Sequence, residues 1–189
     1  MMRYAIWLLL AGLPLIQGCA PVMLGGAAAT GVVMVEDRRT VGTITEDQGI
    51  EIKASNRIGE RFKDGVHVNV TSFNRMLLIT GEVPDASAKS EAERIARAVE
   101  NVRGVYNELA VSGVSSFGTR TNDAILTSKV KARFVDAQKF NPLHVKVVTE
   151  NNVVYLLGLV KKQEAADATE VARTTSGVQK VVRVFEYLD

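Results

Sequence analysis

The 189-residue sequence predicts an α+β protein built from two tandem copies of one small unit, each with the order helix, strand, strand, helix, strand. Three observations predict it: an internal duplication, apolar residues at the four-residue spacing of helices, and the apolar–polar alternation of half-buried strands. Two helices on one face of a three-stranded mixed sheet would form a two-layer core, so each unit is expected to be an αββαβ sandwich.

The duplication consists of five blocks that occur in the same order in both halves of the chain. The block at 54–62 recurs at 126–134, and the block at 67–70 recurs at 144–147. The other matched pairs are 78–83 with 156–160, 94–97 with 170–173, and 101–105 with 177–181. Five ordered matches indicate a repeated structural unit of about 65 to 70 residues, a size that is marginal for folding alone.

Both helices of each unit are predicted from apolar residues that fall on one helix face. In the first helix these are Ala54, Ile58 and Phe62, matched by Leu126, Val130 and Phe134. In the second helix they are Ala92, Ile95, Ala96 and Val99, matched by Ala168, Val171, Ala172 and Thr175.

The strands are predicted from alternation and from the turns between them. Apolar residues alternate over 66–70 and 143–147, and the return strands are expected at 76–80 and 153–157. Asn74-Arg75 and Asn151-Asn152 suit tight hairpin turns, because Asn tolerates a positive φ. Strands at 105–111 and 181–187 would close the two units. Gly81 and Gly158 end the return strands, where a missing side chain allows a bulge or a close backbone approach.

The amino terminus has the parts of a secretory signal, with Arg3 before an apolar run from Tyr4 to Ile16. The alternative, a retained transmembrane anchor, is disfavoured because the run is shorter than the roughly 20 residues needed to span a bilayer. The sequence before Cys19 resembles a lipobox, which implies cleavage after residue 18 and acylation of Cys19. Ala20 rather than Asp follows the cysteine, which looks like export to the outer membrane, facing the periplasm.

Composition and spacing then divide the chain. We expect a signal peptide at 1–18, an acylated glycine-rich tether at 19–45, a first domain at 46–113, a linker at 114–120 and a second domain at 121–189. Without Arg3, 22 basic side chains face 21 acidic ones. A nearly neutral chain lacks the basic surplus of a nucleic-acid binder.

Motifs for catalysis are absent from the sequence, which contains no nucleophile motif, metal-ligand cluster or phosphate loop. We therefore expect a protein that is not an enzyme and has no cofactor. His67 and His144 occupy matched positions and could suggest a metal. They lie in different units without close carboxylate or Cys ligands in the sequence, so a half-buried strand position is the favoured interpretation and no metal site is predicted.

The repeated blocks, with Gly81 and Gly158 at the signature glycine, resemble the BON domain of bacterial envelope proteins. The resemblance covers essentially the whole chain. It implies an outer-membrane lipoprotein whose second BON domain binds anionic phospholipid and which supports envelope integrity at the division site. The alternative that it implies is a periplasmic protein-interaction scaffold acting on the β-barrel assembly machinery.

The residues themselves partly support a lipid contact in the second unit. Its first helix carries Lys129, Lys131 and Arg133 against Asp123, whereas basic and acidic residues are mixed on the matching helix. Ile125 lies just off the core stripe, where lipid-binding relatives place a tryptophan, and could enter the headgroup layer. A solvated basic face is the alternative. The predicted lipid-binding residues are Asn122, Ile125, Leu126, Lys129, Ala132 and Arg133.

Overall fold

The computed structural model describes residues 37–63 and 65–189, and residues Asp37–Asp189 belong to one compact unit. Cys19, the signal peptide at 1–18 and most of the predicted tether lie outside the described residues. Along the described chain, no helix combines the length and apolar character that crossing a bilayer requires.

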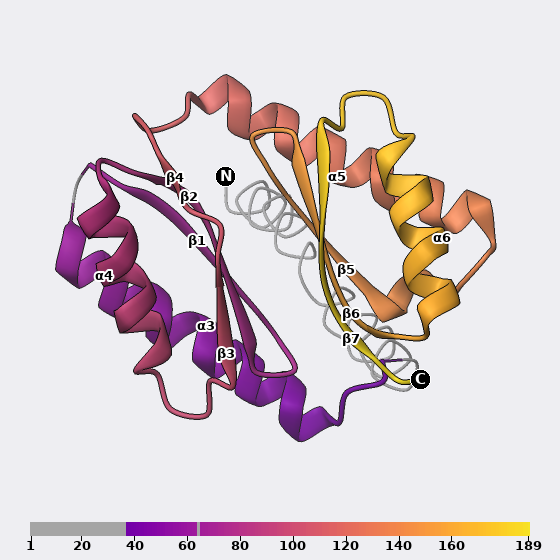
Figure 1. Cartoon of the computed structure of the whole chain (residues 1–189), viewed down its shortest axis with the longest axis horizontal. Coiled ribbons are helices and arrows are strands. Elements are labelled where there is room, and N and C mark those ends of the chain that lie inside the picture. The colour runs from indigo at the N-terminus through magenta and orange to yellow at the C-terminus, as the bar shows by residue number, and fades with distance from the viewer. Residues whose placement is uncertain (1–36, 64) are drawn as a thin grey trace, which may run out of the picture. The chain divides into compact units, whose positions relative to one another are not determined.

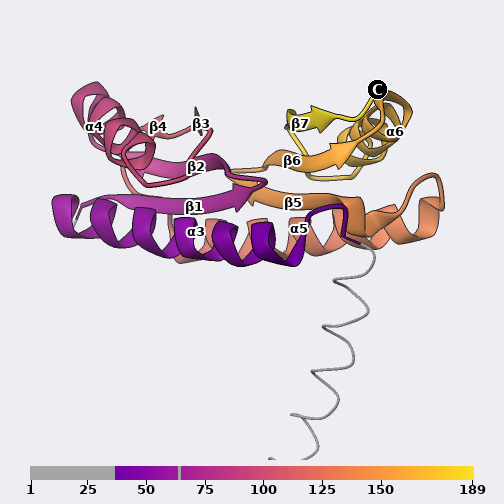
Figure 2. The same ribbon diagram turned by 90° about the horizontal axis from the view of Figure 1, so that it is seen from below.

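The first repeat contains helix α3 (Val41–Phe62), strands β1 (His67–Phe73) and β2 (Met76–Val83), helix α4 (Ala86–Arg97) and the short strands β3 (Gly104–Asn107) and β4 (Ala110–Val111). The second contains helix α5 (Phe117–Ala137), a 3-10 turn η1 (Pro142–His144), strands β5 (Val145–Glu150) and β6 (Val153–Val160), helix α6 (Lys162–Arg173) and strand β7 (Lys180–Tyr187). Figure 1 shows both repeats, and Figure 2 shows α3 along β1 and α5 along β5.

The two sheets have the same topology, which confirms the predicted α+β class with mixed sheets. In each repeat the first two strands pair antiparallel, and the middle strand pairs with the closing strand in parallel. The predicted closing strand at 105–111 differs, because it is split into β3 and β4, which both pair with β2. The side chain of Leu109 is buried in the core at this break, and the side chain of Asn107 accepts a hydrogen bond from the Leu109 amide.

The first helix of each repeat begins at a polar N-cap residue rather than at the predicted boundary. The hydroxyl of Thr40 accepts from the amide of Thr43, so α3 starts at Val41. The hydroxyl of Ser116 accepts from the amide of Thr119, so α5 starts at Phe117. Such caps satisfy amide groups that have no partner within the helix. The predicted tether at 19–45 and linker at 114–120 therefore both extend too far into helices.

The predicted helix faces and hairpins are confirmed. Ala54, Ile58, Val130 and Phe134 are buried under the sheets, and Phe62 packs at the edge of the first core. The four hairpin residues 74, 75, 151 and 152 all have φ between 48° and 63°. A buried aspartate on each first helix holds the adjacent hairpin. Asp47 accepts from the amides of residues 74 and 75, and Asp123 accepts from those of residues 151 and 152.

The outer faces of the two sheets form a third apolar cluster between the repeats. Alternate residues of β2 point to opposite sides, so Leu77 and Ile79 enter the first core while Leu78 enters the inter-repeat cluster. Leu78 and Phe73 of the first repeat pack there with residues of the second, namely Tyr155, Leu157 and Val184. Each sheet is thus covered on both faces, which compensates for the small core of a single repeat.

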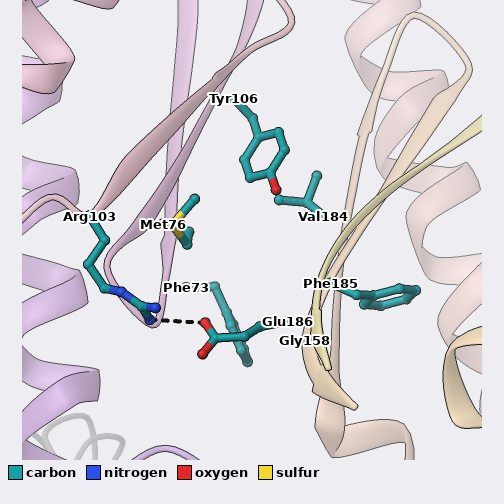
Figure 3. Close-up of a pocket in the computed structure, with 8 residues that line it drawn as sticks. All are labelled: Phe73, Met76, Arg103, Tyr106, Gly158, Val184, Phe185 and Glu186. Carbon is teal, nitrogen blue, oxygen red and sulfur yellow. Dashed lines mark hydrogen bonds and ion pairs between the residues drawn. The ribbon is translucent and has the colours of Figure 1, made fainter. Parts of the chain in front are cut away.

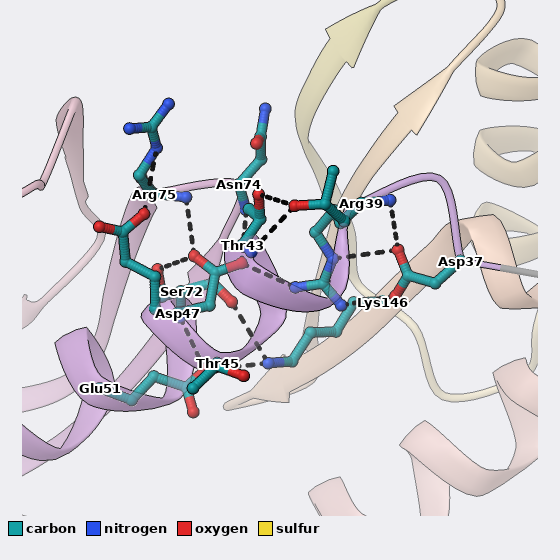
Figure 4. Close-up of polar contacts among 12 residues, drawn as sticks. Asp37, Arg39, Thr43, Thr45, Asp47, Glu51, Ser72, Asn74, Arg75 and Lys146 are labelled. Atoms are coloured by element: carbon teal, nitrogen blue, oxygen red, sulfur yellow. Dashed lines mark hydrogen bonds and ion pairs between the residues drawn. The ribbon is translucent and has the colours of Figure 1, made fainter. Parts of the chain in front are cut away.

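Residues 37–39, predicted to be part of the solvated tether, are bound to both repeats instead. The guanidinium of Arg39 contacts Asp37 and Asp47 at 2.7 and 2.8 Å and lies 3.9 Å from the centre of the Phe73 ring. Figure 4 shows this network together with Lys146 of the second repeat, whose ammonium lies 3.0 Å from a carboxylate oxygen of Glu51. Arg38 binds Glu164 of the second repeat, 126 residues away, so the prediction is wrong because this segment meets folded partners that the sequence around it does not show.

Candidate functional site

Helix α5 has a buried face and an exposed face, and the buried one accounts for one mistaken prediction. Leu126, Val130 and Phe134 are at most 2% exposed. Gly177 packs beside Leu126, because a β carbon added to the glycine would lie 3.4 Å from a methyl carbon of the leucine. The prediction that Leu126 contacts lipid is therefore wrong, because its position on the core stripe takes it into the protein interior.

The exposed face contains a shallow depression of about 500 Å³, which lies around Ile125. Ile125 is 51% exposed, and Lys129 and Ala132 follow it on the same face. The depression is lined by Thr121, Ala124, Ile125, Ser128, Lys129 and Ala132. Three of the predicted lipid-binding residues thus lie together on one open surface.

Two further apolar residues of this face were missed in the sequence. Phe117 is 80% exposed and Val135 is 60% exposed. They are 18 residues apart, which is five helical turns or about 27 Å, so both point in the same direction from the helix axis. Phe117 was missed because it fell in the predicted linker, and Val135 because it adjoins the core residue Phe134. An α-helical projection begun at residue 117 would have found both.

The basic side chains on this face are free of ion pairs among the described residues. Lys129 and Lys131 are exposed and have no carboxylate within 4.0 Å there. Asp123, counted in the sequence as their counter-charge, is 4% exposed and binds the hairpin amides. The acidic residue on the exposed part of α5 is instead Asp136.

Two other predicted lipid-binding residues contact neighbouring elements of the second repeat. The Arg133 guanidinium donates to the carbonyl of Val171 and the hydroxyl of Thr175, at 3.0 and 2.9 Å. The Asn122 amide donates to the side chain of Asn152 at 2.8 Å. Arg133 therefore binds carbonyl and hydroxyl oxygens near the carboxyl end of α6, and its contact with lipid stays a prediction.

Helix α3 of the first repeat provides an internal comparison. It also exposes an apolar residue, Ile52, by 62%. Its lysine and one of its two arginines form ion pairs, and the other arginine, Arg57, donates to the carbonyl of Ala98. Lys53 lies 2.9 Å from Glu100, and Arg61 lies 3.3 Å from Glu91. Only on α5 does the described chain combine an exposed apolar stripe with unpaired lysines.

The two glycines lie inside the central strands β2 and β6, two residues before their ends, and each lies against the backbone of a neighbouring segment. A β carbon at Gly81 would lie 2.0 Å from the carbonyl oxygen of His67, and the φ of Gly81 is +114°. A β carbon at Gly158 would lie 2.4 Å from the carbonyl oxygen of His144. The prediction that these glycines end the return strands is therefore wrong, because strand pairing continues for two more residues, whereas the expected close backbone approach is present in both repeats.

The fold brings carboxylates from distant parts of the sequence close to both histidines. The Nδ1 atom of His67 lies 3.0 Å from Glu82 and 3.9 Å from Glu150, and that of His144 lies 3.6 Å from Glu164. Burial raises the pKa of Glu150. Burial alone would also raise the pKa of Glu82, but hydrogen bonds from Asn151 and the Ser115 amide outweigh it and the net shift is downward. These contacts depend on strand pairing and on the second repeat, so sequence spacing could not reveal them.

A second cavity, of about 250 Å³, lies between the repeats (Figure 3). Its lining is mostly apolar, with Phe73 and Tyr106 from the first repeat and Phe185 from the second. Its charged residues, Arg103 and Glu186, bind each other at 3.0 Å. The cavity thus contains a satisfied ion pair rather than a set of groups poised for acid–base or nucleophilic chemistry.

Comparison with known proteins identifies the repeated unit. The family model of the BON domain matches residues 46–113 and again residues 122–189. The chain is 40% identical to the outer membrane lipoprotein DolP of Haemophilus influenzae, over 92% of this chain and 91% of that protein. It is 30% identical to the 21 kDa hemolysin of Actinobacillus pleuropneumoniae, over 80% and 79% of the two chains. It is 28% identical to the osmotically-inducible protein Y of Escherichia coli K12, over 85% and 90%. The chain therefore belongs to the BON-domain family, as a dual-BON protein similar to DolP.

Proposed function

We propose that this chain is an outer-membrane lipoprotein, acylated at Cys19 and facing the periplasm, whose second BON domain binds anionic phospholipid through α5. The observation that carries the proposal is a broad exposed face of α5 with the apolar residues Phe117, Ile125 and Val135 and the unpaired lysines Lys129, beside Ile125, and Lys131, beside Val135. An amphipathic helix of this kind lies in the interface with its apolar residues among the headgroups. Its similarity to DolP supports the outer-membrane location.

The energies are consistent with a weak contact that depends on the anchor. Each lysine near an anionic surface contributes about 1 kcal/mol, so two contribute about 2 kcal/mol. Full burial of a large apolar side chain contributes roughly 1.5–3 kcal/mol, and partial insertion of three contributes less than their sum. Because the acyl chains hold the domain beside the membrane, a weak contact acts at high effective concentration. The proposed result is a non-catalytic protein that gathers where anionic lipid is abundant, such as the division site, and supports envelope integrity there.

The test is co-sedimentation of residues 37–189, which form one compact unit, with vesicles that contain or lack phosphatidylglycerol. We expect binding to the anionic vesicles only, and loss of binding when Ile125→Asp and Lys129→Glu are combined. The matched control is Ile52→Asp with Lys53→Glu, which makes the same changes on the exposed face of α3. Equal losses from both double variants would contradict a site on α5.

A protein-interaction scaffold acting on the β-barrel assembly machinery is the competing outcome. Absence of binding to any vesicle, together with site-specific cross-linking of α5 to a subunit of that machinery, would favour it. Binding that survives the α5 double variant while the α3 double variant abolishes it would move the lipid contact to the first BON domain.

A further inference from the structure

We propose that His67, Glu82 and Glu150 form a binding site for a divalent transition-metal cation between the two BON domains. His67 and Glu82 belong to the first repeat, where they are paired across β1 and β2, and Glu150 ends β5 of the second. One ligand atom from each residue can be chosen so that all three lie within 4.8 Å of one another. A bound ion would therefore join the repeats directly.

The geometry is close to that of a coordination shell. Metal–ligand distances of about 2.0–2.2 Å for imidazole and carboxylate place neighbouring tetrahedral ligands roughly 3.4 Å apart. His67 Nδ1 lies 3.0 Å from Glu82 Oε2 and 3.9 Å from Glu150 Oε1. Small side-chain rotations would bring the three atoms to equal separations. One imidazole with two carboxylates is a donor set that suits Zn²⁺ or Mn²⁺.

The second observation is a carboxylate oxygen of the cluster that accepts no hydrogen bond from the described residues. Glu150 is only 6% exposed. Its Oε2 atom accepts hydrogen bonds from the side chains of Asn69 and Thr80. Its Oε1 atom has no hydrogen-bond donor within reach along the described chain and faces His67 at 3.9 Å. Holding one oxygen while leaving the other free is how outer contacts orient a metal ligand.

The cluster contains two carboxylates and one imidazole, a combination that favours binding of a cation. Glu82 is 1% exposed, and its other partners are the neutral side chain of Asn151 and the amide of Ser115. Within the described residues, no lysine or arginine forms an ion pair with Glu82 or Glu150. Two buried carboxylates therefore face one imidazole, and buried charges require an opposite charge or a metal ion.

An entry path exists beside α5. A depression of about 390 Å³ is lined by His67 and Glu150, and by Arg120 and Asp123 on the helix. A hydrated ion can reach Glu150 through this opening and lose part of its water as it meets the carboxylates.

His144 provides the matched control. It is as buried as His67, with 13% against 15% of its side chain exposed, and it also lies near a carboxylate. Its Nδ1 atom is buried without a hydrogen-bond partner among the described residues, but only one carboxylate lies within 4.0 Å of it, that of Glu164, which is already bound by Arg38. A histidine with one engaged carboxylate does not make a comparable site.

The experiment is calorimetric titration of Zn²⁺, and separately Mn²⁺, into the full chain purified in a non-ionic detergent and stripped with a chelator. We expect one ion per chain with a dissociation constant below roughly 10 µM for one of the two metals, and an apparent Tm that rises with metal concentration. Glu150→Gln and His67→Asn should each weaken binding by at least about tenfold, whereas His144→Asn should bind as the parent chain does.

Three results would overturn the proposal. The first is the absence of binding by either metal to the parent chain. The second is binding that Glu150→Gln and His67→Asn leave unchanged, and the third is binding that His144→Asn weakens equally. Circular dichroism identifies any variant that fails to fold. In that case the other ligand variant and the visible spectrum of the Co²⁺-loaded parent chain decide whether imidazole and carboxylates coordinate the ion.

Discussion

Arg38 donates hydrogen bonds to both carboxylate oxygens of Glu164, at 2.6 and 2.8 Å, although 126 residues separate the two in sequence. Arg38 also donates to the carbonyl of Leu159, while the adjacent Arg39 binds Asp47 in the first repeat. Arg38 therefore binds the second repeat and Arg39 binds the first. A bidentate, partly buried pair of this kind is stronger than an ordinary surface ion pair.

The Arg38–Glu164 pair predicts a pH-dependent stability. Hydrogen bonds from Arg38 lower the pKa of Glu164 from 4.5 to about 2. Because the folded-state pKa is depressed, this stabilisation is present above pH 4.5 and is lost as the pH falls toward 2. We expect Glu164→Gln to lower the free energy of unfolding by on the order of 2 kcal/mol at pH 7, and by much less near pH 2.5.

Urea denaturation of residues 37–189 at the two pH values measures this difference. Glu170→Gln is the control, because Glu170 pairs with Arg173 in an exposed contact within one helix. The control should change the unfolding free energy by less than about 0.5 kcal/mol. A Glu164 effect that is the same at both pH values would contradict the assignment to its charge.

We expect large losses of stability when the glycines of the central strands are replaced by alanine. Gly81→Ala would place a methyl group 2.0 Å from a backbone oxygen at a φ of +114°, so we expect a loss above roughly 3 kcal/mol. Gly158→Ala meets a backbone oxygen at 2.4 Å without a positive φ and should cost less. Gly59→Ala, inside α3 with open space around it, should instead stabilise the protein by about 0.5–1 kcal/mol. Thermal unfolding of the three variants gives this order, and a silent Gly81→Ala would refute it.

The apolar stripe of α5 predicts a gain of lipid affinity when its central residue becomes aromatic and amphipathic. Ile125→Trp should bind anionic vesicles several-fold more tightly, because indole favours the interface. The sole tryptophan of the chain is Trp7, so residues 37–189 carrying this substitution contain a single tryptophan, which can be excited selectively over the tyrosines. Its emission should shift to shorter wavelength with anionic vesicles. Ile52→Trp on α3 should show no such shift, and equal shifts would argue against a specific face.

Because Lys129 and Lys131 of α5 are exposed and unpaired, we expect vesicle binding to depend on salt concentration. Lys129→Gln and Lys131→Gln should each weaken vesicle binding by roughly fivefold at low ionic strength, corresponding to about 1 kcal/mol. Both effects should shrink at 0.5 M salt, where charges are screened within a few ångströms. Lys53→Gln, which removes an ion-paired lysine from α3, should have no effect. Differences that persist unchanged in high salt would show that the lysines act by some means other than charge.

We expect Phe117, at the start of α5, to make its own apolar contribution to vesicle binding. Phe117→Ala should reduce vesicle binding at low and at high salt alike, because its contribution is apolar. The 80% exposure of Phe117 makes the substitution nearly neutral for folding, so the melting temperature should stay within about 2 °C of the parent value. Val41→Ala, another exposed apolar residue at a helix start, is the control and should leave binding intact.

The features that depend on neighbours along the chain could be predicted from the sequence. Helical spacing placed Val130 and Phe134 in the core, Asn74 and Asn151 marked the hairpins, and the duplication established two units of one fold. These features follow from backbone geometry and from the burial of one face of each element, which short-range periodicity records.

Which charged groups lack a partner and which apolar residues stay exposed could be seen only from the packing of the folded chain. Only packing shows that Asp123 binds a hairpin, that Phe117 stays uncovered, and that His67 meets Glu150 of the other repeat. The physical reason is that both faces of each sheet are buried, so a residue's surroundings depend on the register and stacking of strands that are far apart in the chain. No local pattern encodes that stacking.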